Sequence, residues 1–207
     1  MNTFKKGLGL LAGFALWTIA LSFLDVQAIG PDGSTVGFAT LNSFVHRLTG
    51  VHLSLYILTD WLSLIPLGLA AGFGILGLVQ WIRRKQLRQV DGSLLLLGGF
   101  YGVVMGAFFF FEKVVINYRP ILIDGILEAS YPSSTTMLVL CIMPTGAMEL
   151  SARIQDPRLR KWIAAAMMVF TSFMVLARLV SGVHWFTDIV GGILLSGGLV
   201  MLYRAVK

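Results

Sequence analysis

Charged residues are scarce in this sequence. Only 13% of its 207 residues are Asp, Glu, Lys or Arg, about half the share of an ordinary soluble domain. So little charge cannot cover a globular surface with polar groups, which excludes a soluble enzyme. A disordered chain is excluded as well, because disorder requires low hydrophobicity together with high net charge.

Cysteine is rare too, while apolar residues are abundant. Cys141 is the one cysteine, so the chain cannot form an internal disulfide. Hydrophobic residues make up 57% of the chain, and 23 residues are glycine. No repeat, low-complexity tract or flexible linker divides the sequence. We therefore predict one integral membrane domain over residues 1–207.

Six apolar segments are close to the roughly 20 residues that a helix needs to cross the hydrocarbon core of a bilayer. They are residues 7–24, 54–82, 93–111, 133–150, 162–180 and 186–203. The pattern predicts an all-α membrane protein, a bundle of six transmembrane helices. The last two segments are so close in sequence that they must form a tight hairpin.

The first segment shares two features with a secretory signal. Lys5 and Lys6 precede it, and Val26-Gln27-Ala28 would serve as a cleavage site. Its apolar run of about 17 residues is longer than the core of a signal peptide. We expect it to remain as a membrane anchor.

The basic residues predict the orientation, because Lys and Arg favour the cytoplasmic side of a membrane. Most of the 16 basic residues fall on one side of the six predicted spans. These are Lys5, Lys6, Arg83, Arg84, Lys85, Arg88, Arg153, Arg158, Arg160, Lys161, Arg204 and Lys207. We therefore expect a multi-pass protein of the cell membrane with both termini in the cytoplasm. The other four, Arg47, Lys113, Arg119 and Arg178, lie at the outer side or its boundary.

The longest outer loop, residues 25–53, contains a helical pattern. Leu41, Phe44, Val45 and Leu48 have the spacing of one helix face. This pattern predicts a short amphipathic helix that lies in the membrane interface. The helix either caps the bundle or gates a cleft through which lipid enters, and the sequence leaves both interpretations open.

Three polar clusters gather at the outer ends of the predicted spans. The first is Glu112-Lys113 with residues 117–120, the second is residues 131–136, and the third is Arg178 with residues 181–188. Ionisable groups at membrane depth are candidates for function. Asp60, near the outer end of the second span, either makes a hydrogen bond between helices or partners an active-site arginine.

The second cluster has the composition of an anion site. Pro132 is suited to the first position of a helix, so the N–H groups that follow have no partner within the helix. Together with the hydroxyls of Ser133 and Ser134 they can bind an anion. Ordinary capping, with the hydroxyls bonded to helix carbonyls, is the alternative.

The third cluster predicts nucleophilic chemistry on phosphate. His184 and Asp188 are four residues apart at a helix start, so both can face the same way. A carboxylate on one imidazole nitrogen leaves the other free as a nucleophile. Arg178 and Arg119 would bind phosphate oxygens. The alternative is a structural His–Asp pair with two interfacial arginines.

These residues resemble a known family. Arg119-Pro120, Pro132-Ser133-Ser134 and the Arg178-x5-His184-x3-Asp188 pattern are similar to the three-part signature of the type 2 phosphatidic acid phosphatase superfamily, which also includes the vanadium haloperoxidases. The resemblance covers the last four spans. It implies a membrane phosphatase that uses no metal or other cofactor and acts on lipid phosphates or isoprenoid diphosphates. The expected partner is a membrane lipid and not a nucleic acid.

The resemblance also implies residue roles. The phosphate would be held by Arg119, Arg178, Ser133, Ser134 and Thr135. His184 would attack phosphorus to form a phosphohistidine, and Asp188 would orient it. Water would then release phosphate.

Two departures from the family pattern bear on the chemistry, while Ser134 in place of Gly and Ala177 in place of Ser are milder. Glu112 stands where the family has Lys, and the neighbouring Lys113 is about 100° away around a helix; both are accessory candidates. Thr135 stands where the family has the His that protonates the leaving group. A hydroxyl is a poor general acid. Without a good acid, the departure of an alkoxide slows more than the departure of a phosphate.

We therefore expect diphosphates to be favoured over monoesters. Glu112, with a pKa raised by burial, or His52 could act as a substitute acid. The main alternative is a catalytically degenerate relative that binds or translocates anionic lipid headgroups, and a phosphotransferase is a further one.

Overall fold

The computed structural model describes residues 2–207, and these residues form an all-helical bundle with six helices long and apolar enough to cross a membrane. The spans are α1 (Thr3–Phe23), α3 with α4 (Leu53–Leu62 and Leu64–Arg84), α5 (Gly92–Lys113), α6 (Ser134–Arg153), α7 (Pro157–Val180) and α8 (Phe186–Val206). The predicted all-α membrane fold is confirmed.

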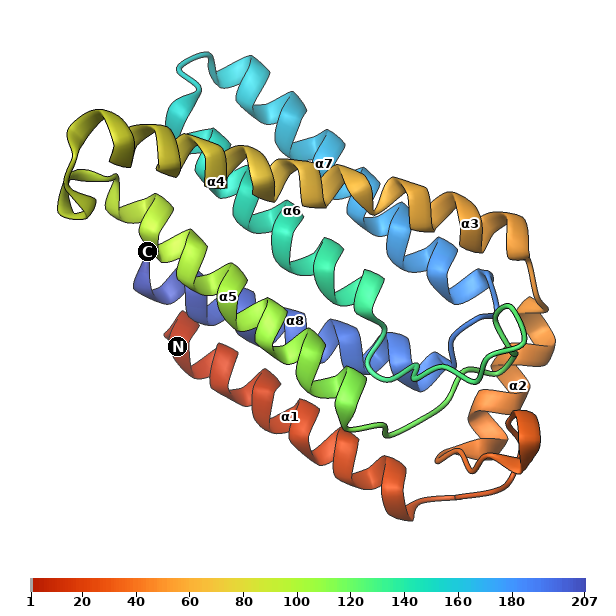
Figure 1. Cartoon of the computed structure of the whole chain (residues 1–207). Helices are drawn as coiled ribbons and strands as arrows, with labels where there is room; N and C mark the ends of the chain where they lie inside the picture. Colours follow the sequence, from red (N-terminus) through yellow and green to blue (C-terminus); the bar gives the residue numbers. More distant parts are fainter. Residues whose placement is uncertain (1) are drawn as a thin grey trace.

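The second predicted span, 54–82, is divided into two helices at Ser63. Pro66 has no N–H to donate to the carbonyl of Leu62, four residues earlier. The Ser63 hydroxyl instead donates to the carbonyl oxygen of Asp60 at 2.5 Å. Ser63 keeps helical backbone angles, φ −65° and ψ −17°, so α4 continues in nearly the direction of α3 (Figure 1).

The seventh helix, α7, begins earlier than the predicted 162–180. Pro157 opens the helix, and the carboxylate of Asp156 accepts the N–H of Arg158 at 2.8 Å. Both are strong helix-start signals. The hydropathy pattern missed this first turn because its residues are charged.

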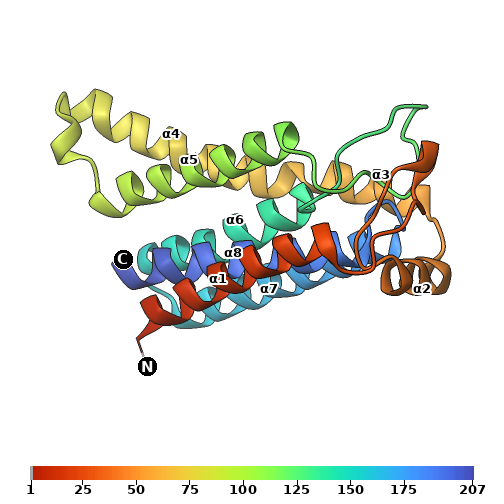
Figure 2. The same cartoon turned by 90° about the horizontal axis from the view of Figure 1, so that it is seen from below.

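The α6 helix is the centre of the bundle. It contacts α4, α5, α7 and α8, and Figure 2 shows it between α4 and α5 on one side and α1, α7 and α8 on the other. Its buried Met137 and Cys141 pack with Leu97 of α5 and Leu195 of α8 in the main apolar core. Because α6 is held on all sides, its first turn is a fixed platform at one end of the bundle.

The two ends of the bundle differ in what they carry. Figure 1 shows both chain termini at one end, which we call the terminal end. The opposite end, which we call the α2 end, holds α2, the start of α3 and the connections that follow α5 and α7.

The predicted interfacial helix is present as α2 (Ala39–Thr49), and it packs against α8. Its buried Asn42 donates to Thr187 Oγ1 at 3.0 Å and accepts the Thr187 N–H at 3.2 Å. Leu41, Phe44 and Leu48 of the predicted stripe are exposed on the other side. The polar face of α2 therefore docks on the bundle, and the apolar stripe is left for the membrane interface.

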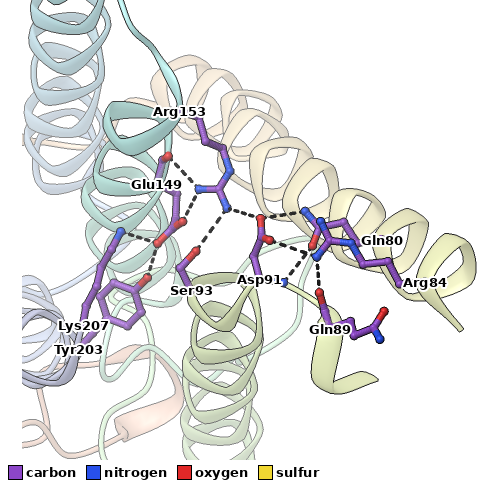
Figure 3. A network of polar contacts seen from close by, with 9 residues as sticks. All are labelled: Gln80, Arg84, Gln89, Asp91, Ser93, Glu149, Arg153, Tyr203 and Lys207. Carbon is purple, nitrogen blue, oxygen red and sulfur yellow. Dashed lines mark hydrogen bonds and ion pairs between the residues drawn. The ribbon is translucent and has the colours of Figure 1, made fainter. Parts of the chain in front are cut away.

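A network of polar contacts joins four helices at the terminal end (Figure 3). Its centre is Glu149 of α6, whose side chain is fully buried. The hydroxyl of Tyr203 donates to Glu149 at 2.9 Å, and Arg153 and Lys207 form ion pairs with it. Arg153 also contacts Ser93 at 3.3 Å. Glu149 thus joins α6 to α8 as a buried internal anchor.

We expect Glu149→Ala to destabilise the protein by on the order of 3 kcal/mol, because it leaves the Tyr203 hydroxyl and two cations without their shared buried partner. Asp91→Asn is the matched control: Asp91 belongs to the same network, but its side chain is 43% exposed, so we expect a loss below about 1 kcal/mol. Unfolding of the purified protein in detergent measures both losses. Equal losses would contradict the central role of Glu149.

Candidate active site

The connection between α5 and α6, residues 114–133, folds back on itself at the α2 end. The N–H of Arg119 donates to the carbonyl oxygen of Glu128 at 3.0 Å, and the N–H of Ser130 donates to that of Asn117 at 2.9 Å. At the end of the connection, the N–H of Ser133 donates to the carbonyl oxygen of Asp188 at 3.1 Å. These bonds bring the three predicted polar clusters together.

The turn between α7 and α8 depends on Gly182. Its φ of +68° lies in the left-handed region that favours glycine. A Cβ at this position would lie 2.0 Å from the carbonyl oxygen of Gly50. Arg178 before the turn and His184 after it are both buried.

His184 and Asp188 form a buried pair. His184 Nδ1 lies 3.7 Å from Asp188 Oδ2, a close contact that is longer than a hydrogen bond. Asp188 is fully buried and accepts the N–H of Trp185 at 2.9 Å and the amide of Asn117 at 3.2 Å. These two donors fix the carboxylate beside the imidazole.

The imidazole of His184 is neutral near pH 7. Burial lowers the pKa of His184 to about 4, and the positive charges of Arg119 and Arg178 lower it as well, while the contact with Asp188 raises it. A neutral imidazole keeps one ring nitrogen with a free lone pair. The site therefore holds an imidazole that carries no proton on one ring nitrogen near pH 7.

Arg119 lies against the other side of the imidazole. Its Nη1 is 3.5 Å from His184 Nε2 and 3.5 Å from the carbonyl oxygen of Val183. Its Nε is 2.9 Å from Glu128 Oε2, an ion pair with a carboxylate that is 40% exposed. The Arg119 guanidinium thus lies between the His184 imidazole and the partly exposed Glu128 carboxylate.

Arg178 is almost fully buried and is held by α3. Its Nη1 donates to Thr59 Oγ1 at 3.0 Å and to the carbonyl oxygen of Tyr56 at 3.3 Å. Its Nη2 donates to Asp60 Oδ1 at 3.3 Å. Asp60 therefore partners an arginine of the site, which is one of the two interpretations that the sequence left open.

The start of α6 faces the same place. Ser134 and His184 line a small cavity of about 10 Å³, room for about one water molecule. Thr135 is buried in the first helical turn. Within residues 2–207, the Ser133 hydroxyl and Arg178 Nε are buried without a hydrogen-bond partner. Unsatisfied buried polar groups are rare and call for an explanation; here they suit an anion.

Glu112 lies at the entrance of this region. It lines the small cavity beside His184 and also a larger one of about 440 Å³, which Arg119 and Glu128 share. Lys113 is exposed at the end of α5. His52 lies elsewhere, with its Nε2 at 2.9 Å from the carbonyl oxygen of Thr49. Glu112 is exposed and not buried as the hypothesis required. Of the two proposed substitute acids it is still the one that lies beside His184.

A sequence model of the PAP2 superfamily matches residues 99–207. This chain is a member of the PAP2 superfamily. The matched residues run from within α5 to the end of α8 and include Arg119, Ser133, Arg178, His184 and Asp188. They do not include α3.

A solved structure supports the same fold for the whole chain. A transmembrane PAP2-type phosphatidylglycerolphosphate phosphatase from Bacillus subtilis superposes with a TM-score of 0.59 at 19% sequence identity, covering 97% of this chain and 94% of that chain. No curated protein matches the sequence significantly.

Several contacts of this PAP2 site have no signal in the sequence. Tyr56 and Thr59 lie in an apolar run, and Glu128 lies in a connection without a motif. To predict the roles of Tyr56 and Thr59, one would need to know in advance that α3 packs against α7. No group of three or more His, Cys, Asp or Glu side chains arranged to hold a metal ion occurs within residues 2–207.

We expect His184 to titrate near pH 4 in the folded protein, far below the ordinary value of 6.5, because burial disfavours the imidazolium. NMR of protein labelled with ¹⁵N-histidine measures this pKa, and the signal that disappears in His184→Gln assigns it. Asp188→Asn should lower the pKa further, since the Asp188 contact raises it. A midpoint near 6.5 would contradict the buried neutral state.

Proposed function

We propose that this PAP2 protein is a membrane phosphatase that hydrolyses lipid phosphates or diphosphates through a phosphohistidine on His184. One observation carries the proposal: two buried guanidinium groups, those of Arg119 and Arg178, lie beside a buried neutral imidazole. Guanidinium groups bind phosphate oxygens in pairs of hydrogen bonds. The superfamily and the fold support the phosphatase class.

The proposed reaction has two steps. Arg119 and Arg178 hold the phosphate oxygens, with the Ser133 and Ser134 hydroxyls and the N–H groups of the first α6 turn. The free nitrogen of His184 attacks phosphorus, a P–N bond forms and the bond to the leaving oxygen breaks. Asp188 stabilises the imidazolium. Water then attacks phosphorus, which releases inorganic phosphate and restores neutral His184.

The leaving group decides which substrates are favoured. An alkoxide must gain a proton as it leaves, whereas a phosphate leaving group is already a stable anion. Thr135 occupies the position where the superfamily signature has an acidic His, and its hydroxyl cannot supply that proton well. General acid catalysis contributes about 10²–10⁴-fold. We propose that isoprenoid diphosphates are therefore better substrates than lipid monoesters.

We expect purified wild-type protein to release inorganic phosphate from at least one lipid in a panel of farnesyl diphosphate, phosphatidate and phosphatidylglycerolphosphate, the last chosen because the Bacillus subtilis neighbour acts on it. His184→Ala should lower the rate by at least about 10³-fold, as expected when a nucleophile is removed. His52→Ala is the control and should keep the wild-type rate. Equal rates for wild type and His184→Ala would favour a lipid-binding or translocating role.

We expect kcat/KM for farnesyl diphosphate to exceed that for phosphatidate by roughly 10²-fold, the lower end of a general acid contribution. Thr135→His should narrow the gap by raising the phosphatidate rate. Glu112→Gln should lower the phosphatidate rate selectively if Glu112 is the substitute acid. A clear preference of the wild type for phosphatidate would contradict the assignment.

We propose that the site opens to the outer face of a cell membrane and that both termini are cytoplasmic. The basic loops lie at the terminal end, and Lys and Arg favour the cytoplasmic side. In a Cys141→Ala background, an impermeant maleimide added to intact cells should label Asp124→Cys but not Gln89→Cys. The reverse labelling would overturn the orientation.

A further inference from the structure

The α3 helix makes more contacts with the two arginines than the proposed reaction explains. The Arg178 Cζ atom lies 4.7 Å from the centre of the Tyr56 ring, and the Arg119 Cζ atom lies 5.7 Å from the same centre. One aromatic ring is therefore within reach of both cations. A cation near an aromatic face is stabilised by about 0.5–2 kcal/mol, more where water is excluded.

Two buried like charges at one site repel each other and lose hydration. The site offsets this with a separate carboxylate for each arginine, Glu128 for Arg119 and Asp60 for Arg178. Both carboxylates are partly exposed, with side-chain exposures of 40% and 56%. The Tyr56 ring is the element that the two arginines share.

The contacts of Arg178 use one part of its guanidinium group and leave another part free. Thr59 Oγ1 and the Tyr56 carbonyl accept from Nη1, and Asp60 accepts from Nη2. An arginine has five N–H donors. The N–H on Nε is buried without a partner within residues 2–207, and one N–H on Nη2 remains as well. Nε and Nη2 form one edge, which matches two phosphate oxygens.

We propose that Tyr56, Thr59 and Asp60 of α3 are positioning residues that set the Nε–Nη2 edge of Arg178, and through the shared ring also Arg119, toward the phosphate. This inference rests on the proposed phosphate site. It adds a helix that lies outside residues 99–207, the part of the chain that the superfamily model matches. The three residues act through the arginines and do not contact the reacting atoms.

The test compares, at each position, a variant that keeps the contacting group with a variant that removes it. Tyr56→Phe keeps the ring and Tyr56→Leu removes it, so we expect kcat/KM close to wild type for the first and a roughly tenfold loss for the second. Thr59→Ser keeps the hydroxyl that accepts from Arg178, and Thr59→Val removes it. We again expect kcat/KM close to wild type for the first and a roughly tenfold loss for the second. Leu58→Ala, an exposed position on the same helix, is the control and should match wild type.

The second readout is the binding of inorganic phosphate, measured as thermal stabilisation of the purified protein in detergent. It requires no turnover. Tyr56→Leu and Thr59→Val should weaken phosphate binding in parallel with kcat/KM, in addition to lowering the melting temperature without phosphate, since each removes a partner of a buried arginine. A merely structural role would lower the melting temperature and leave the phosphate affinity of the folded protein unchanged, which would overturn the inference.

A double-mutant cycle tests whether Thr59 acts through Arg178. In an Arg178→Lys background the guanidinium fork is absent, so Thr59→Val should have little further effect on phosphate binding. Additive losses would overturn the inference. If wild type binds phosphate in an α3-dependent way but hydrolyses none of the lipids, the proposed function fails and the positioning role stands. If wild type does not bind phosphate, the positioning role fails as well.

Discussion

Two positive charges buried side by side are the constraint on which the rest of this site depends. Arg119 and Arg178 are almost fully buried, and each must recover the free energy lost with its water shell. Glu128 and Asp60 supply opposite charges from two different segments, and Tyr56 supplies a ring to both. The N–H on Arg178 Nε still has no hydrogen-bond partner within residues 2–207, and this unpaired donor is why we propose a phosphate ligand here.

The same positive charges set the chemistry of the histidine. Burial lowers the pKa of His184, and the arginines add to that effect. The site therefore keeps a neutral imidazole where an exposed histidine would be partly protonated, as the proposed nucleophilic role requires. Asp188, fixed by the N–H of Trp185 and the amide of Asn117, stands ready for the charge that the imidazole would gain on bonding to phosphorus. In the proposed function, the same two arginines thus bind the phosphate and help to keep the His184 imidazole neutral.

The rest of the fold holds these groups in place. The α6 helix contacts four other helices, and the N–H of Ser133 at its start donates to the carbonyl oxygen of Asp188 in α8. At the other end of the same helix, Glu149 ties α6 to α8 through Tyr203 and Lys207 (Figure 3). The first turn of α6 therefore forms one wall of the site, and α3 forms another.

The sequence by itself determined the spans, the PAP2 signature and the positions of His184 and Asp188, because hydropathy and motif spacing are short-range properties of the chain. It missed the break at Ser63 and the anchoring role of Glu149. Only the tertiary structure decided that Asp60 partners Arg178 and that Tyr56 serves both arginines. Asp60 and Arg178 are 118 residues apart, and no local pattern encodes which faces of two distant helices meet.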